Sequence, residues 1–138
     1  MAKHVLYDCV ITVNAVTLTD RAKSVSWVVG IAKQPAAAMS EAQSYSMAGV
    51  QEPDDVTIEY YQDYAASNVY VTHTTLYQNR TSFVLTAKAS SAADSATNPN
   101  FTATVFITKF PLLSGSRGDG HMASITYAIA GAITFDVS

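Results

Sequence analysis

The sequence predicts an all-β fold with one helix, arranged as an antiparallel β-sandwich or barrel. Apolar and polar residues alternate with a period of two in seven segments, which is the pattern of half-buried strands. Strands of parallel sheets are usually apolar on both faces, so one-sided alternation favours antiparallel pairing. The chain has 138 residues, 49% of them apolar, which is enough for one hydrophobic core. We therefore expect residues 1–138 to form a single β domain.

The expected strands follow one another along most of the chain, separated by turn residues. Each has apolar residues at every second position, with Ser, Thr, Asn or charged residues between them. The segments with this alternation are 5–13, 25–31, 56–60, 83–87, 101–107, 125–129 and 133–137.

One helix is expected over residues 63–78. Tyr61, Ala65, Val69, Thr72 and Leu76 recur at spacings of three and four, which would place them on one stripe of a helix. The segment 69–75 is rich in Val and Thr, however, which are poor helix formers and favour a strand. The pattern alone leaves both interpretations open.

Two segments break the alternation. Residues 30–55 contain an Ala-rich run, Ser and Gln residues and an acidic turn, without a clear structural pattern. A stretch of that length in a compact domain usually has a functional role. Residues 89–98 are Ala, Ser, Asp and similar residues with little to bury, so they are expected to form a surface loop.

The composition excludes several classes of protein. Charged residues make up only 14% of the chain, and the net charge is −3, which fits neither a disordered chain nor a free-standing nucleic-acid reader. Cys9 is the single cysteine and cannot form an intrachain disulfide. No apolar run approaches the length of a membrane span, and no signal peptide precedes the first strand, so we expect an intracellular domain without a membrane partner. Such sparse charge suggests that much of the surface contacts other protein.

No credible catalytic, cofactor or metal site is present in the sequence. The histidines His4, His73 and His121 are scattered, and Cys9 lies among apolar residues where a small buried thiol is expected. Carboxylates cluster at 52–55, but Pro53 and the strand that follows indicate a turn. Residues 115–120 are rich in glycine but lack the Gly-Lys-Ser/Thr ending of a phosphate loop. We therefore expect a protein that is not an enzyme and has no cofactor.

Two alternative functions remain open at this point. Any barrel with an apolar interior would show the same alternation, so the chain could bind a small apolar ligand. The tripeptide Arg117-Gly118-Asp119 is the one that cell-adhesion receptors bind, so a virion surface or adhesion module is the other alternative.

An ordered series of short segments resembles the tail tube (major tail) proteins of long-tailed, non-contractile bacteriophages, of the single-domain type. The segments run in family order over about 120 residues. They include 13–20, Tyr-Ser-Met-Ala-Gly-Val at 45–50, 56–60, 62–67, 95–102, 110–116 and Gly-Ala-Ile-Thr at 131–134. The family begins its helix at 62–67, which favours the helix over the strand at 63–78. The chain departs from the family at 34–39, where three consecutive alanines replace the usual β-branched residues.

The resemblance implies a structural subunit of a siphovirus tail. Family members form homohexameric rings that stack head to tail into a hollow tube, through which genomic DNA is ejected. The head-to-tail contact between rings joins unlike surfaces, so it repeats without closing and builds a filament. The implied partners are further copies of the chain and the tape measure, tail terminator and distal tail proteins. The implied location is the virion, after assembly in the host cytoplasm.

The resemblance also suggests site residues. A long assembly arm at about 30–55 would contact neighbouring subunits, and its candidate contact residues are Gln34, Pro35, Met39, Tyr45, Met47 and Val50. The lumen wall must not bind DNA, because several Lys or Arg contacts to phosphates would stall its passage. Faces of Ser, Thr and Asn with occasional acids would suit that wall, and Asp8 and Glu59 are the candidate lumen-facing residues. The same faces could equally form the outer surface of the tube.

Overall fold

The computed structural model describes residues 9–40, 42–118 and 120–137, which form ten strands and one helix. The strand pairs are all antiparallel. The predicted all-β fold with one helix is therefore confirmed. The elements are β1 (Val10–Val13), β2 (Val16–Thr17), β3 (Ala22–Ser26), β4 (Ile31–Pro35), β5 (Ser46–Gln51), β6 (Val56–Tyr61), α1 (Val69–Asn79), β7 (Phe83–Lys88), β8 (Asn100–Lys109), β9 (Met122–Ile129) and β10 (Thr134–Asp136).

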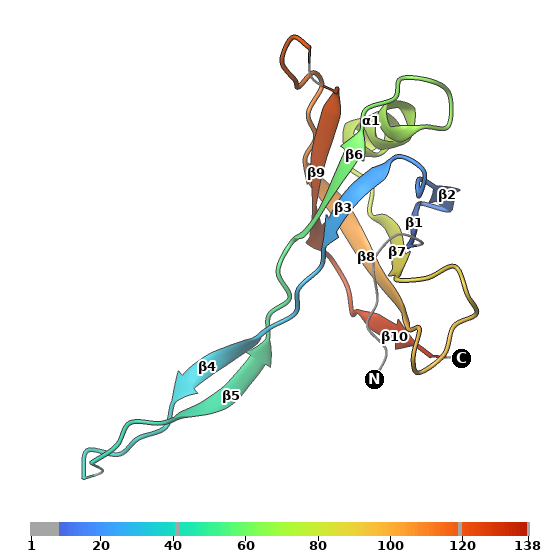
Figure 1. The fold of residues 1–138 in the computed structure, drawn as a ribbon. Helices are drawn as coiled ribbons and strands as arrows, with labels where there is room; N and C mark the ends of the chain where they lie inside the picture. The colour runs from blue at the N-terminus through green and yellow to red at the C-terminus, as the bar shows by residue number, and fades with distance from the viewer. Residues whose placement is uncertain (1–8, 41, 119, 138) are drawn as a thin grey trace.

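Eight of the strands belong to one curled sheet that forms the body of the molecule (Figure 1). Its order is β2-β1-β7-β8-β9-β6-β3, and β10 pairs with the first residues of β8. The long strand β8 thus pairs with β9 along its second half and with β10 along its first. Within the described residues the path is open at β2 and β3, so the strands form a curled open sheet.

The core lies on the inner face of this sheet. Val56, Ile58 and Tyr60 of β6 are fully buried, whereas Thr57 and Glu59 between them are not. The same alternation holds in β7 and β9, and the buried residues of all these strands form one cluster. The alternation predicted for these segments is confirmed. Residues 5–8 of the first predicted strand lie outside the described residues.

The predicted strand 25–31 is wrong in its second half. β3 ends at Ser26 and β4 begins at Ile31, so the chain leaves the body between them. Val29 and Ile31 are more than half exposed, because no part of the chain that the structure describes covers them there. The burial predicted for the last strand is also wrong, because Phe135 of β10 and Val137 are both more than half exposed.

The predicted helix exists but begins six residues later than expected. The Asp63 carboxylate accepts a hydrogen bond from the Ala65 N–H at 2.9 Å, and Ser67 has a positive φ of 61°, so residues 63–68 form a turn. α1 then presents Val69, His73 and Leu76 to the core. Ala65, expected on the buried stripe, is exposed. The helix is rich in Val and Thr, and its burial against the sheet compensates for their low helix propensity.

The two segments that lacked a pattern differ from each other. Residues 89–98 form the expected surface loop, held by the Lys88–Asp94 ion pair at 3.1 Å and by Asn98 Nδ2, which donates to the Ala92 carbonyl at 2.9 Å. Residues 30–55 are not irregular. They contain β4 and β5, paired as a separate two-stranded sheet.

Candidate functional site

The hairpin formed by β4, β5 and the residues between them (31–51, hereafter the arm) projects from the body as a long extension (Figure 1). Every residue of β5 is exposed, and β4 is exposed except at Ala32. A single two-stranded hairpin is at best marginally stable in water, because it has no third strand or helix to cover it. Among the described residues, the strands of the arm pair only with each other and are exposed on both faces.

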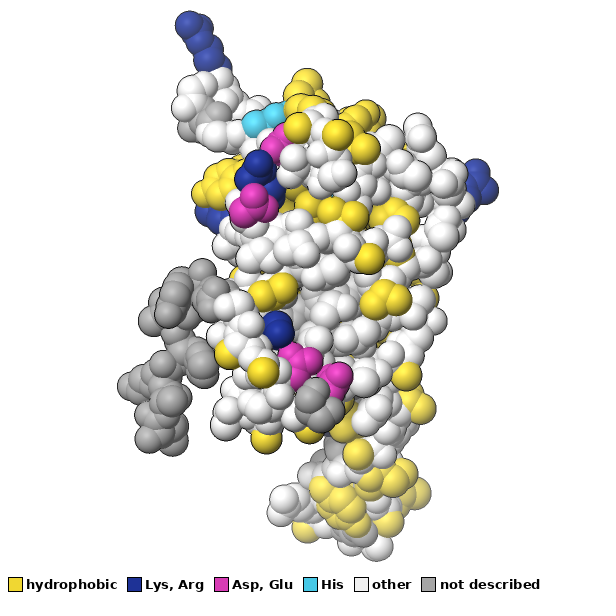
Figure 2. Space-filling model, turned by 90° about the vertical axis from the view of Figure 1, so that its right-hand side faces the viewer, with side chains coloured by type: hydrophobic (Ala, Val, Ile, Leu, Met, Phe, Trp, Pro, Cys, Tyr) yellow, Lys and Arg dark blue, Asp and Glu magenta, His cyan; other side chains and the backbone are white. Residues whose placement is uncertain are grey.

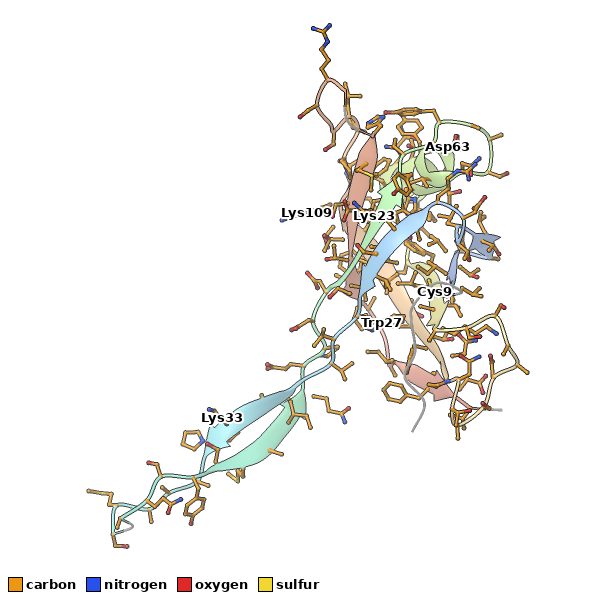
Figure 3. The ribbon with its side chains drawn as sticks, viewed as in Figure 1. Cys9, Lys23, Trp27, Lys33, Asp63 and Lys109 are labelled. Atoms are coloured by element: carbon orange, nitrogen blue, oxygen red, sulfur yellow. The ribbon has the colours of Figure 1, made fainter. Side chains whose placement is uncertain are left out.

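The strand register gives the arm one apolar face. Gln34 pairs with Met47, and the Ala36 N–H donates to the Tyr45 carbonyl at 3.1 Å, so these four side chains lie on one side together with Ala32. Figure 2 shows hydrophobic side chains gathered on this part of the molecule. The opposite side carries Lys33, labelled in Figure 3, with Pro35, Ser46 and Ala48.

The structure places all six candidate contact residues on the arm, but not on a single face. Tyr45 and Met47, which are 52% and 58% exposed, share the apolar face with Gln34. Pro35 lies on the opposite face, paired with Ser46. Met39 lies beyond the end of β4 and is fully exposed. Val50 lies where the register shifts between β4 and β5, and it is 68% exposed.

Gly49 is part of this register shift. A Cβ atom at Gly49 would lie 3.0 Å from the Ala32 carbonyl oxygen and 3.1 Å from Gln34 Cγ. Because the first of these contacts is with backbone, a larger residue would move the two strands apart by a few tenths of an ångström. Glycine at this position thus allows the close approach of β4 and β5.

A second exposed apolar region lies at the other end of the body, beside α1. Tyr64, Tyr70, Phe110, Leu112 and Leu113 (hereafter the aromatic end) come from the turn before α1, from α1 itself and from the β8–β9 connection. The rings of Tyr64 and Tyr70 lie 4.9 Å apart, and those of Tyr70 and Phe110 lie 5.9 Å apart. The Tyr64 hydroxyl donates to the Leu112 carbonyl at 3.1 Å. Leu112 and Leu113 are 64% and 83% exposed.

The outer face of the sheet is rich in hydroxyl groups. Ser24 and Ser26 of β3 lie beside Glu59 and Thr57 of β6, and these in turn lie beside Ser124 and Thr126 of β9. Ser24, Ser26, Thr57, Ser124 and Thr126 are hereafter called the hydroxyl face.

Glu59, the candidate lumen residue, lies within the hydroxyl face, and its carboxylate accepts from the Ser24 hydroxyl at 3.4 Å. Lys109 of β8 pairs with Thr126 at the margin of this face and brings a cation there. Asp8, the other candidate, lies outside the described residues.

An apolar cavity of about 360 Å³ lies where β1 and β7 approach β3 and β10. Its lining includes Cys9, Trp27, Phe101 and Phe135, and Figure 3 shows Cys9 and Trp27 at this side of the body. Trp27 Nε1 is buried and has no hydrogen-bond partner among the described residues. Sequence reasoning gave no signal for this cavity, because it forms only where strands distant in the sequence approach each other.

The histidines and carboxylates that were candidates for a catalytic or metal site do not lie together in the described part of the chain. Among the described residues, no group of three or more His, Cys, Asp or Glu side chains is placed to hold a metal ion. His73 is fully buried in the core, and His121 lies against Tyr64 with ring centres 5.6 Å apart. His4 and Asp119 lie outside the described residues, so the Arg117-Gly118-Asp119 tripeptide is described only in part. No helix in the described part of the chain has the length and apolar character needed to cross a membrane.

No protein-family model and no curated protein matches the chain. Solved structures do share its fold. A chain from the virion of a native gene transfer agent particle has a TM-score of 0.68 and 12% identity, over 93% of this chain and 95% of that one. A chain from the tail of an empty gene transfer agent particle, obtained by helical refinement with C6 symmetry, has a TM-score of 0.65 and 10% identity, over 83% and 81% of the two chains. A chain from the anti-feeding prophage baseplate, symmetrised six-fold, has a TM-score of 0.60 and 7% identity, over 100% and 99%. At these low identities the likeness shows a shared fold, one that occurs in tail and baseplate particles.

Proposed function

We propose that the chain is a structural subunit of a phage-type tail tube, in which homohexameric rings stack head to tail. The observation that carries this proposal is the arm. Five large apolar side chains of the arm are more than half exposed in the isolated chain: Ile31, Met39, Tyr45, Met47 and Val50. A partner surface would remove them from water, and other copies of the chain are the simplest source of such a surface.

The fold supports the same proposal. The similar chains belong to particles described as tails, virions and baseplates, and two of those structures carry six-fold symmetry. The outermost strands β2 and β3 have no further strand partner within the described residues, which also favours lateral association, because unpaired strand edges tend to find partners. Rings of six copies would bring the edges of neighbouring sheets together.

The hydroxyl face is our candidate for the wall of the conduit. Hydroxyl groups interact with water and with DNA without the counterion release that makes Lys and Arg contacts strong. Three charged side chains lie at or beside this face: Glu59, Lys109, and Lys23 in the bulge of β3 next to Ser24. A face of hydroxyl groups with a single excess cation would hold DNA only weakly and let it pass during ejection.

The proposed role requires no catalysis and no cofactor. Its partners would be further copies of the chain together with tape measure, tail terminator and distal tail proteins. Its location would be the phage virion, after assembly in the host cytoplasm.

Deletion of part of the arm tests the proposal. Removing residues 36–45 should leave the body folded, because the main-sheet pairings and the core cluster lie outside this segment. Sedimentation velocity at high protein concentration should then show large assemblies for the wild type and monomers for the deletion variant. Equal assembly by both proteins would refute the role of the arm.

The cavity beside Trp27 favours a second candidate function, the binding of a small apolar ligand. Its volume of about 360 Å³ is at the lower end of the range of small-molecule sites. Saturable binding of an apolar dye by the monomer, abolished by Ala87→Phe, which would fill the cavity from β7, would support this function. Failure of the wild type to bind such dyes would remove it.

A further inference from the structure

We infer that the aromatic end of one copy is the docking surface for the arm of a second copy, with Arg117 of the first facing the carboxylates at the root of the second copy's arm. This inference rests on the proposed tube function and names the contact that joins consecutive copies along the stack. Three observations support it: the two surfaces are unlike, they lie at opposite ends of the body, and they carry opposite charges.

The two surfaces lie at opposite ends of the same strands. β6 begins at Val56, beside the root of the arm, and ends at Tyr61, beside the aromatic end (Figure 1). β9 runs the other way, and Tyr61 pairs with Met122 just after the β8–β9 connection. A six-residue strand separates the two ends by roughly 20 Å. Stacking copies along this direction would therefore bring the arm of one copy toward the aromatic end of its neighbour.

The two surfaces differ, so their contact is heterologous. A contact between unlike patches at opposite ends repeats without closing and builds a filament, whereas a patch that binds itself builds a closed dimer. The aromatic end offers Tyr64, Leu112 and Leu113, and the arm offers Tyr45, Met47 and Val50. Aromatic residues and methionine are the types enriched at the centre of protein interfaces.

The charges at the two ends are complementary. Glu52, Asp54 and Asp55 follow β5 at the root of the arm, and all three are exposed. Arg117, also exposed, lies in the β8–β9 connection that carries Leu112 and Leu113. In the described part of the chain, ion pairs join Arg21 to Asp20 and Asp63, and Lys88 to Asp94, and none involves Arg117 or the three root carboxylates. Charges arranged in this way steer association and fix its direction.

Charge reversal tests the pairing. In Arg117→Glu, both the aromatic end and the root of the arm are acidic. In the double variant Asp54→Lys/Asp55→Lys, the root of the arm is basic, and it would face the basic Arg117 of the neighbouring copy. Each variant alone should raise the protein concentration needed for assembly by about tenfold at low salt. An equimolar mixture of the two variants should assemble like the wild type, because each end of one then meets the opposite charge of the other. Light scattering and sedimentation velocity measure both outcomes.

Controls separate this inference from the proposed function. Arg80→Glu makes the same change in net charge at an exposed position after α1 and should assemble like the wild type. Leu112→Ser/Leu113→Ser should impair assembly at any salt concentration, because it removes apolar contacts. Normal assembly of Arg117→Glu, or failure of the mixture to recover, would overturn the inference while leaving the tube function intact. A wild-type protein that never assembles would overturn both.

Discussion

His73 Nε2 lies 2.5 Å from the Tyr127 hydroxyl oxygen in the centre of the core. His73 Nδ1 lies 2.7 Å from the Val69 carbonyl oxygen, which can only accept, so Nδ1 carries the proton. Nε2 of the neutral ring therefore accepts from the Tyr127 hydroxyl, and the Tyr127 oxygen accepts from the Tyr60 hydroxyl at 3.0 Å. The chain of donors and acceptors is complete, and it fastens α1 to β6 and β9.

The folded protein should lose stability in mild acid because of His73. Burial lowers the pKa of His73 from 6.5 to about 4. Between these two pH values the unfolded chain binds a proton that the folded chain does not, so the free energy of unfolding falls as the pH falls. The total loss is about 3 kcal/mol.

Urea unfolding at pH 7, 5 and 4 measures this loss, with His73→Gln as the non-titrating control. The control should show a flatter dependence on pH in this window. An equal dependence in both proteins would assign the acid sensitivity to other groups. Asp63, whose pKa is lowered chiefly by the hydrogen bond from Ala65, contributes stability that is lost only below its ordinary value of 3.8.

Removing either tyrosine hydroxyl should destabilise the protein, but to different extents. Tyr127→Phe leaves both His73 Nε2 and the Tyr60 hydroxyl buried without partners and should cost about 3 kcal/mol. Tyr60→Phe leaves the Tyr127–His73 bond intact and should cost about 1 kcal/mol. Thermal or urea unfolding of the two variants at pH 7 gives the comparison. Equal losses would contradict the position of the Tyr127 hydroxyl between Tyr60 and His73.

The turn between β1 and β2 contains a site for a stabilising substitution. Asn14 and Ala15 have φ values of 48° and 66°, as in the two-residue turns that favour Asn-Gly. Ala15→Gly removes the strain of a Cβ in the left-handed region and should stabilise the protein by about 1 kcal/mol. Ala37→Gly, an exposed alanine without a positive φ, is the control and should not stabilise. A loss of stability in Ala15→Gly would contradict this turn geometry.

Gly49→Val should damage assembly without damaging the body. Its Cβ would contact the Ala32 carbonyl oxygen at 3.0 Å and distort the arm, while the buried core lies elsewhere. Sedimentation velocity should show weaker assembly, and the midpoint of thermal unfolding should match that of the wild type. Ala48→Val, at an exposed neighbouring position, is the control. A lowered midpoint for Gly49→Val would show that the arm is part of the folding unit.

Adding cations to the hydroxyl face should create DNA affinity in assembled tubes. Thr57→Lys/Thr126→Lys places two lysines per subunit on adjacent strands. Retention of short double-stranded DNA by such tubes should be strong at low salt and should fall steeply as salt is added. Thr57→Glu/Thr126→Glu is the control with the opposite charge. Equal DNA binding by the two variants would exclude this face as the lumen wall.

The sequence predicted the elements whose pattern arises from the chain's own core. β6 and β7 alternate strictly because one face of each meets that core, and both were placed within one residue at each end. The start of α1 was wrong because Ala65 and Ala66 are good helix formers, while the Asp63 side chain and Ser67 fold the backbone into a turn.

The arm was recognised as a segment but not as a hairpin. Neither face of β4 or β5 is buried within the chain, so no alternation marks them. The aromatic end and the cavity were not predicted either, because each joins residues distant in the sequence. The sequence did not predict His73 as a core residue. Its burial depends on hydrogen bonds of its two ring nitrogens to the Val69 carbonyl and the Tyr127 hydroxyl, and the second of these joins residues distant in the sequence.

Electron microscopy of the concentrated wild-type protein tests the central claim most directly. The account predicts rings of about six subunits with a central hole, or filaments built from such rings, because unlike ends repeat without closing. Particles of monomer size at every concentration, with the arm exposed as it is in the single chain, would contradict it.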